Sequence, residues 1–270
     1  MALAVPTSLS PSKVSSFKDC ALAFRFSVID KLPEPPSAPA VKGTLVHRAL
    51  ERLYCAEPPE RTIDTALSAL AVAIEEARAD DSEYRELHLD ADAAAAFHDD
   101  AERLVRRYFR MEDPTAIRPI GVELMLEADV GGVRLRGIID RLDLDVDGEL
   151  VVTDYKTGKV PAARYEQGRF GGVHFYAFLC EAVLGRRPAR IQLLYLSEAV
   201  TIVATPSEQS VRGLEGRVGA VWKAVERACA NDDFRPRPGP LCDWCAFRPH
   251  CPAVGASPVA ANGLMAATLP

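Results

Sequence analysis

The stretch "VVTDYKTGK", residues 151–159, ends an apolar run with an acid and a base one residue apart. Side chains of a β-strand alternate between the two faces of a sheet, so Asp154 and Lys156 share one face. Asp140 stands at the polar end of an earlier apolar run, "RGIIDRLD", residues 136–143. A hairpin through "DVDGEL" would pair the two runs and bring Asp140 next to Asp154.

Two carboxylates held side by side repel each other unless positive charge lies between them. A divalent cation is the natural partner, because carboxylate oxygens suit Mg²⁺ and Mn²⁺. Lys156 could then hold or orient an attacking water and stabilise developing negative charge. The set suits metal-assisted hydrolysis of a phosphodiester. The competing interpretation is that Asp154 and Lys156 form an ordinary surface salt bridge. Taken alone, this pair of residues favours the salt bridge.

The apolar patterns predict the elements that must position these residues. Helices are expected over residues 9–29, 43–54, 63–79, 90–112, 171–185 and 207–230, and strands over 121–130, 133–145, 149–156, 189–197 and 200–205. Four prolines within residues 30–42 predict an extended connector. The order favours an α/β or α+β sheet flanked by helices, with a helical subdomain over 57–113. Disorder is expected over 1–9 and 253–270, which leaves a single domain over 10–252.

The composition narrows the class of protein. With 270 residues and 48% hydrophobic content, the chain can bury one substantial core. No apolar run reaches the length of a membrane span and the first residues do not resemble a secretory signal, so a cytoplasmic protein without membrane contact is expected. The net charge of −6 argues against nucleic-acid binding by the whole surface but leaves room for a local basic patch.

These features together resemble the RecB-type branch of the PD-(D/E)xK nuclease superfamily. The resemblance rests on "GTLVHRALE" (43–51), "RGIIDRLD", "VVTDYKTGK", a tyrosine-bearing helix and a terminal cysteine cluster, in this order over roughly residues 8–252. It implies a restriction-endonuclease-like fold, with a central mixed sheet flanked by helices. It also implies a DNase site that depends on Mg²⁺ or Mn²⁺.

The resemblance assigns a role to each motif residue. His47, Asp140 and Asp154 become metal ligands together with the Tyr155 carbonyl, and Lys156 becomes the catalytic lysine. Taken alone, His47 is more often a packed histidine, but Glu51 one turn later and the other motifs favour the ligand role.

Two further positions belong to the implied site. Glu123, in "GVELML", stands where many relatives carry an acid, and it either binds a second metal or water or is a solvated surface residue. Tyr176 is the tyrosine of the helix. Relatives usually carry glutamine four residues before it, where this chain has Gly172. Gln167 and His174 are the candidates to replace that glutamine, and its loss puts substrate geometry in doubt.

Seven cysteines are too few for a disulfide scaffold in a chain of this length. Cys242, Cys245 and Cys251 form a C-x2-C-x5-C triplet, one thiolate short of a closed metal site. The resemblance to the iron–sulfur subgroup, which includes AddB-type nuclease domains and CRISPR-associated iron–sulfur exonucleases, supplies Cys20 as the fourth ligand. It implies a 4Fe–4S cluster that joins the two chain ends. A structural zinc site using His250 is the alternative, and the remaining cysteines, Cys55, Cys180 and Cys229, are expected to be small core residues.

A basic stripe beside the metal site is expected to bind DNA phosphates. It comprises Lys159, Arg164, Arg169, Arg186, Arg187 and Arg190, with Arg235, Arg237 and Arg248 near the cysteines. Phe170, Phe175 and Trp244 could stack on bases, although core packing is the favoured role for each. The sequence carries no phosphate-binding loop, so a partner helicase or end fraying would have to open a duplex.

The sequence therefore predicts a Mg²⁺- or Mn²⁺-dependent DNA exonuclease that prefers single-stranded or frayed ends and acts in repair or recombination. One alternative is a catalytically silent nuclease fold that serves as a DNA-binding or assembly module. The other is a structure-specific endonuclease.

Overall fold

The computed structural model describes residues 2–161 and 166–254, and the side chains of 166–171 are not among the described parts. The chain divides into two compact units. The first comprises Met1–Pro35, Asp129–Leu135 and Glu215–Pro270, and the second comprises Pro36–Ala128 and Arg136–Leu214. The tail expected over 253–270 lies outside the described residues from 255 onward.

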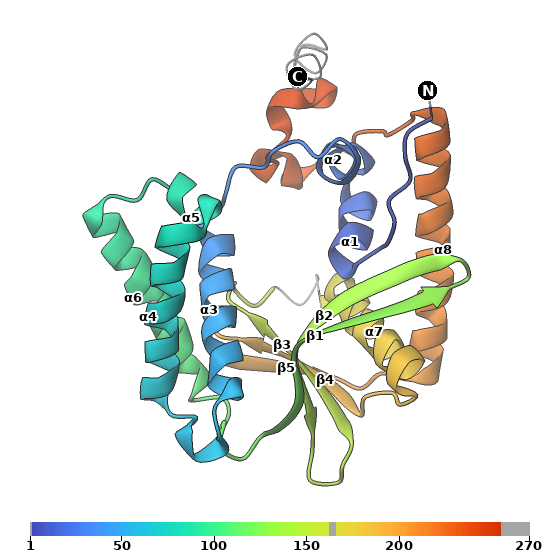
Figure 1. Cartoon of the computed structure of the whole chain (residues 1–270). Helices are drawn as coiled ribbons and strands as arrows, with labels where there is room; N and C mark the ends of the chain where they lie inside the picture. Colours follow the sequence, from blue (N-terminus) through green and yellow to red (C-terminus); the bar gives the residue numbers. More distant parts are fainter. Residues whose placement is uncertain (1, 162–165, 255–270) are drawn as a thin grey trace. The chain divides into compact units, whose positions relative to one another are not determined.

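A mixed five-stranded sheet forms the centre of the fold (Figure 1). Its strands are β1 (Arg118–Val130), β2 (Val133–Leu144), β3 (Leu150–Lys156), β4 (Arg190–Tyr195) and β5 (Val200–Ala204), in that spatial order. The pairs β2–β3 and β4–β5 are antiparallel, whereas β3 and β4 are parallel. The predicted sheet flanked by helices is confirmed.

The helix α7 (Glu166–Leu184) provides the crossover that the parallel pair β3–β4 requires. It packs closely on β2 at Gly137. A Cβ atom at this position would lie 2.9 Å from Leu179 Cδ1 and 3.3 Å from Tyr176 Cε1. Glycine therefore allows the helix to approach the sheet closely enough for Tyr176 to lie beside β2.

Four helices of the second unit precede the sheet, and three of them lie within residues 57–113. They are α3 (Ala38–Cys55), α4 (Ile63–Asp80), α5 (Ser82–Glu86) and α6 (Ala91–Tyr108), with a short 3-10 turn η2 (Pro58–Glu60) after α3. Each begins at a residue whose side-chain oxygen accepts a hydrogen bond from a backbone N–H of the first turn: Ser37, Thr62, Asp81 and Asp90. Their apolar faces share one core with Tyr155 of β3 and Leu194 of β4. This core attaches α3 to the sheet.

In the first unit, both ends of the described chain contribute to a second core. Its elements are α1 (Pro11–Asp19), α2 (Ala21–Phe24), the π-helical turn η1 (Arg25–Ile29), the C-terminal part of α8 (Glu208–Asn231) and the 3-10 turns η4 (Pro240–Trp244), η5 (Arg248–His250) and η6 (Pro252–Val254). Phe24, Val225, Cys229 and Phe247 are among its buried residues. Among the described residues, no helix combines the length and apolarity needed to span a bilayer.

Two sequence expectations for this unit are wrong. The continuous helix over 9–29 is interrupted at Cys20, whose φ of −159° and ψ of 111° are extended and so end α1 before α2 begins. The N-terminal residues are also not disordered up to residue 9. Leu9 is completely buried and its N–H donates to the Arg134 carbonyl at 2.9 Å. A short parallel bridge to Leu135 therefore orders this segment.

Candidate active site

The end of β3 carries three of the predicted site residues, and helix α3 passes close to it. A Cβ at Gly43 would lie 3.2 Å from Thr157 Oγ1, just after β3. One turn further along α3, His47 Nε2 lies 3.1 Å from the Tyr155 carbonyl oxygen. The small residue at 43 thus allows α3 to approach closely enough to bring His47 to the strand.

The β2–β3 hairpin places Asp140 as the sequence predicted. The register pairs Arg141 with Thr153, and its continuation puts Asp140 opposite Asp154. Asp140 Oδ2 accepts a hydrogen bond of 2.7 Å from the Tyr155 N–H. Residue 155 therefore contacts both His47, through its carbonyl, and Asp140, through its amide.

Glu123 reaches the same point from β1 through an unusual backbone conformation. Its φ of 46° is left-handed, which is costly for a side chain with a Cβ and is retained only where the surroundings enforce it. Glu123 Oε1 lies 3.9 Å from His47 Nδ1, and Asp140 Oδ2 lies 3.6 Å from the same nitrogen. The ligand atoms of these three residues all fall within 4.8 Å of one another.

This arrangement fits a divalent cation. A neutral His47 that donates through Nε2 to the Tyr155 carbonyl presents a lone pair at Nδ1, and that lone pair faces the oxygens of Glu123 and Asp140. Three electron-pair donors that face one another need either a proton or a positive ion between them. One imidazole and two carboxylates are ligands that Mn²⁺ and Mg²⁺ accept.

The pKa values follow from burial and from this crowding. Burial, reinforced by the negative charge of Asp140, raises the pKa of Glu123 to about 6. Burial, followed by the charge of Asp154, also raises the pKa of Asp140. Burial lowers the pKa of His47, an effect that Asp154 and Glu123 partly offset. Each shift disfavours the charged form, and a bound cation would offset the shifts of the two carboxyl groups.

Asp154 and Lys156 form an ion pair beside this group. Burial alone would lower the pKa of the Lys156 ammonium, but the Asp154 carboxylate raises it above its ordinary value, with a smaller contribution from Asp140. Lys156 therefore stays charged near neutral pH and cannot accept a proton. Its role in the site is that of a positive charge and a hydrogen-bond donor.

Tyr176 comes to the site from α7. Burial raises the pKa of its hydroxyl, and the negative charges of Asp154, Asp140 and Glu123 raise it further. The hydroxyl thus stays protonated and is available as a donor beside Asp154. Gly172 is in the described part of α7, whereas the side chain of Gln167 is not, so the replacement for the missing glutamine stays a prediction.

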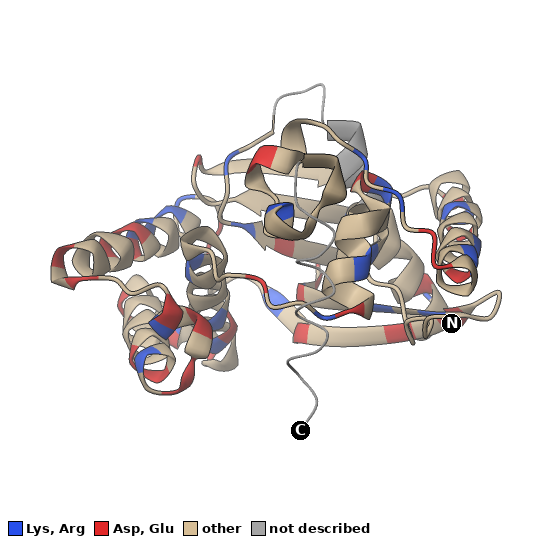
Figure 2. Ribbon diagram, turned by 90° about the horizontal axis from the view of Figure 1, so that it is seen from above, with Lys and Arg blue, Asp and Glu red and all other residues tan. Residues whose placement is uncertain are grey.

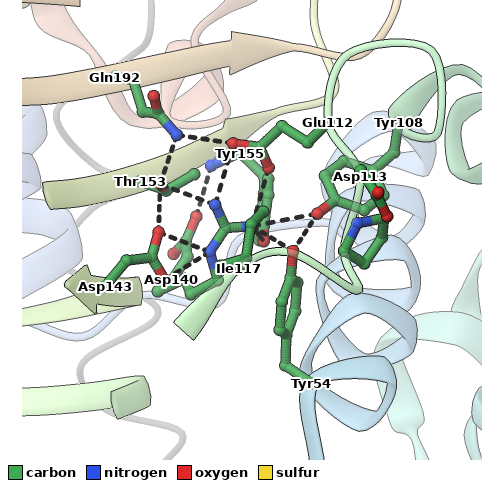
Figure 3. A network of polar contacts seen from close by, with 12 residues as sticks. Tyr54, Tyr108, Glu112, Asp113, Ile117, Asp140, Asp143, Thr153, Tyr155 and Gln192 are labelled. Carbon is green, nitrogen blue, oxygen red and sulfur yellow. Dashed lines mark hydrogen bonds and ion pairs between the residues drawn. The ribbon is translucent and has the colours of Figure 1, made fainter. Parts of the chain in front are cut away.

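Arg141 is the residue that sequence reasoning missed. It follows Asp140 directly, so its side chain enters the opposite face of the sheet, where it is completely buried. Its guanidinium contacts Tyr54, Tyr108, Glu112, Asp143, Thr153 and Tyr155. Figure 3 shows the labelled tyrosine and carboxylate side chains of this network converging beside β3. The available signal was an arginine two residues before Asp143, and so on the same face of the strand, because a buried charge requires partners.

Three residues of the predicted basic stripe, Arg186, Arg187 and Arg190, lie away from the carboxylates. Arg190 pairs with Val151, at the start of β3, whereas the site lies at the end of that strand. Arg186 and Arg187 come just before Arg190 in the sequence. Helix α7 returns the chain to the end of the sheet where β3 begins, so these arginines lie at the opposite end of the strands from the carboxylates. Lys and Arg are interspersed with Asp and Glu along the helices rather than gathered in one stripe (Figure 2).

The arginines at the end of the sheet where β3 begins already have acidic partners. Arg186 contacts Glu149 at 3.2 Å, Arg187 contacts Glu181 at 3.7 Å and Arg190 contacts Asp145 at 3.1 Å. Exposed Lys159 remains near the site, three residues after Lys156. Arg164 and the side chains of Arg169 and Phe170 lie outside the described residues.

The four predicted cluster cysteines come together in the first unit. Cys20, Cys245 and Cys251 pack against one core, and the charges of Cys20, Cys242 and Cys251 all act on the Cys245 thiol. Burial, with these neighbours, raises the pKa of Cys245. Backbone N–H groups of Arg237 and Gly239 donate to the sulfurs of Cys20 and Cys242, each at 3.4 Å.

Other cysteine and aromatic expectations give a mixed result. Cys180 and Cys229 are buried as predicted, but Cys55 is exposed because it ends α3. Phe175 is buried in the core. Core packing is wrong for Trp244, which is 89% exposed in the turn between Cys242 and Cys245.

The mixed sheet, its flanking helices and the acidic site at a strand end define a restriction-endonuclease-like protein. The chain belongs to the PD-(D/E)XK nuclease superfamily, whose family model matches residues 8–252.

Known proteins that are similar to this chain include a phage protein and a solved structure. The Gene 69 protein of Mycobacterium phage L5 is 28% identical over 134 residues, which cover 48% of this chain and 44% of that protein. The match thus spans less than half of the phage protein's length. A solved structure of a candidate exonuclease from Eubacterium rectale covers 97% of this chain and 94% of its own, with a TM-score of 0.59 and 13% identity. At this identity the likeness shows a common fold.

Proposed function

We propose that this protein is a Mg²⁺- or Mn²⁺-dependent deoxyribonuclease, and specifically an exonuclease that prefers single-stranded or frayed ends. The observation that carries the proposal is the convergence of His47 Nδ1, Glu123 Oε1 and Asp140 Oδ2 within 4.8 Å, beside the Asp154–Lys156 ion pair. Superfamily membership supports the hydrolytic chemistry. The exonuclease assignment draws on the resemblance and on the description of the Eubacterium rectale protein.

The chain's own residues then have distinct roles. His47, Glu123 and Asp140 would hold the metal together with Asp154. The Tyr155 carbonyl, a further ligand by the resemblance, accepts from His47 Nε2 and so faces the other ring nitrogen than the one that faces Glu123 and Asp140. When bound, the metal supplies positive charge that polarises the phosphate and activates water. Lys156, kept protonated by Asp154, orients the attacking water and stabilises charge on the phosphate. Tyr176 donates a hydrogen bond from α7 and fixes Asp154.

A groove beside α3 offers room for the substrate strand. It has a volume of about 590 Å³ and is lined by Gly43, Thr44, His47, Arg48, Glu51, Glu123 and Thr157, with Pro39 and Ala40. Arg48 is a cation in this lining, and Lys159 lies just beyond the end of β3. Contacts of this kind bind phosphates without reading sequence. Arg48 and Lys159 are therefore the proposed DNA contacts, in place of Arg186, Arg187 and Arg190.

The proposal extends to a 4Fe–4S cluster held by Cys20, Cys242, Cys245 and Cys251. Cysteine ligation and N–H donors to the sulfurs are typical of such clusters. A structural zinc site, in which His250 would serve as a ligand, is the alternative.

The proposal also covers the cellular role, the location and a partner of the protein. A role in DNA repair or recombination and a cytoplasmic location fit a nuclease of this resemblance. A helicase partner would supply single strands from duplex DNA.

The function is tested by digestion of labelled single-stranded DNA with purified wild-type protein, Asp154→Asn and Lys156→Ala, in Mn²⁺ and in EDTA. Each substitution should reduce cleavage by at least about a hundred-fold, because Asp154 would hold the metal and Lys156 supplies positive charge to the reacting phosphate. Asp147→Asn, an exposed loop carboxylate, is the matched control and should cleave normally.

Three outcomes would contradict the proposal. Cleavage by Asp154→Asn at the wild-type rate would remove the site assignment. DNA binding by the wild-type protein without metal-dependent cleavage would support the silent binding module. Cleavage of circular single-stranded DNA would replace the exonuclease with an endonuclease.

A further inference from the structure

The buried guanidinium of Arg141 contacts three of the elements that build the active site, from the face of the sheet opposite to it. Its Nε lies 2.9 Å from both carboxylate oxygens of Asp143, and its Nη2 lies 3.1 Å from Thr153 Oγ1. Its Nη1 lies 2.7 Å from the Tyr155 hydroxyl and 2.8 Å from the Tyr54 hydroxyl. One planar group therefore joins β2, β3 and α3.

Arg141 and two of the residues that it contacts, Tyr155 and Tyr54, are directly connected to residues of the candidate site. Arg141 is the chain neighbour of Asp140. Tyr155 carries the amide that donates to Asp140 and the carbonyl that faces His47 Nε2. Tyr54 lies on α3, seven residues after His47 and on the same side of the helix.

Stability alone does not explain this network. A buried charged group is often replaceable by apolar side chains of similar volume without loss of stability. Arg141 is completely buried, and its acidic partners are Asp143 and Glu112. Burial alone would lower the pKa of Arg141, but Tyr155, Tyr108 and Glu112 raise it, so the charge is permanent. An apolar side chain could fill the same volume, but it could not reproduce the five N–H donors of the planar guanidinium, which fix several acceptors at once.

We propose that Arg141 is a positioning residue that clamps α3 to β3 and thereby sets the separation of His47 from Asp140 and Glu123. The clamp acts on the metal-ligating geometry without touching the substrate. This inference rests on the proposed function, because it assigns a role within that site. Groups that orient metal ligands without binding the metal typically contribute ten- to a hundred-fold to metal affinity.

The test uses Arg141→Lys, which keeps the charge and loses the fork, and Tyr54→Phe, which removes one hydroxyl that links α3 to the clamp. The matched control is Leu70→Ala in the buried core of α4, which destabilises the helical region but removes no hydrogen bond of Arg141. Melting temperatures are recorded for all variants. Mn²⁺ binding is measured by the spin-resonance signal of the free ion.

Arg141→Lys and Tyr54→Phe should weaken Mn²⁺ binding about ten-fold relative to Leu70→Ala, even where the melting temperatures are equal. In cleavage assays kcat should fall and excess Mn²⁺ should restore part of it, while KM for DNA stays unchanged. Equal Mn²⁺ affinity in the clamp variants and in Leu70→Ala would show that Arg141 only stabilises the fold.

A second readout does not depend on metal. Hydrogen exchange of the Tyr155 amide reports its bond to Asp140, and it should be faster in Arg141→Lys than in Leu70→Ala, in EDTA. An unchanged exchange rate would overturn the clamp. A wild-type protein that binds no Mn²⁺ would instead overturn the proposed function, and the amide exchange would still decide whether Arg141 positions residue 155.

Discussion

At the scale of single residues, the site is a group of side chains whose protonation is controlled by their neighbours. Glu123, Asp140 and His47 all resist carrying charge, whereas Lys156 keeps its proton because of Asp154. Metal binding must therefore release protons from the carboxyl groups near neutral pH. The Glu123 backbone, with its positive φ, adds strain that the surrounding structure must enforce.

Glu123→Gln should change how stability depends on pH. The pKa of Glu123 is raised to about 6, so between its unfolded value of about 4.5 and pH 6 the folded chain holds a proton that the unfolded chain has released. Folding of the wild-type protein therefore becomes less favourable as pH rises through this window. Because Gln does not titrate, the variant should gain about 1 kcal/mol relative to wild type between pH 4 and pH 7.

The measurement is urea unfolding of both proteins in EDTA at several pH values. Glu127→Gln, an exposed residue on the same strand, is the control. Parallel pH curves for the wild type and Glu123→Gln would show that Glu123 is solvated and unperturbed. Added Mn²⁺ should stabilise the wild type more than Glu123→Gln, because a ligand stabilises the state that binds it.

At the scale of elements, close approach between helix and sheet delivers each side chain to the site. Gly43 brings α3 to the end of β3, and Gly137 brings α7 to β2. The crossover through α7 explains both the position of Tyr176 at the site and the position of Arg186 near the start of β3. Helix α7 thus carries Tyr176 beside the candidate site and leads to Arg186, which has an ordinary acidic partner, at the other end of the strands.

Gly137→Ala should displace α7. The added methyl would lie 2.9 Å from Leu179 Cδ1 and 3.3 Å from Tyr176 Cε1, so the helix or the side chains must move. Overpacking of this kind destabilises by about 1–3 kcal/mol, and here it should also reduce cleavage because Tyr176 moves with the helix. Urea unfolding and the DNA digest measure the two effects.

Gly216→Ala provides the control for this substitution. No atom lies within 4 Å of a Cβ at Gly216, and alanine favours a helix, so this variant should be neutral or more stable by up to about 1 kcal/mol. Equal stability of the two variants would mean that α7 tolerates the methyl and does not rely on close approach.

At the scale of the whole molecule, the two ends of the described chain meet in one compact unit. Cys20 and the cysteine triplet are separated by more than two hundred residues. A cluster that joins them would restrict the unfolded chain strongly, by about 5 kcal/mol in the loop-entropy model for cross-links. Metal assembly and folding are therefore expected to be coupled.

Protein purified without oxygen should be brown and carry about four irons per chain. Cys20→Ala should lose both colour and iron and should unfold at a lower temperature. Cys180→Ala, a buried cysteine outside the set, should keep the cluster and lose only packing. Colourless protein with one zinc per chain would support the zinc alternative, and metal-free protein of unchanged stability in Cys20→Ala would exclude both.

Much of the fold and of the candidate site could be predicted from the spacing of residues that are close together in the sequence. The D-x-K pattern and the hairpin residues predicted that Asp140 and Asp154 would lie side by side, because strand alternation and antiparallel register depend on nearby residues. The order of elements likewise predicted a sheet flanked by helices, and the family resemblance implied that this sheet is mixed. The break at Cys20 was missed, since the apolar spacing continues through it.

Only the tertiary structure decided how distant elements meet at the site. It brought His47 to Tyr155 across more than a hundred residues and turned Glu123 inward through a positive φ. It also buried Arg141 among partners from α3, α6, β2 and β3, and it placed Arg186 near the end of the sheet where β3 begins. These features depend on which helix packs on which strand, and at what distance. Long-range packing of this kind is not encoded in the spacing of neighbouring residues, because periodicity specifies the face of an element but not its partner.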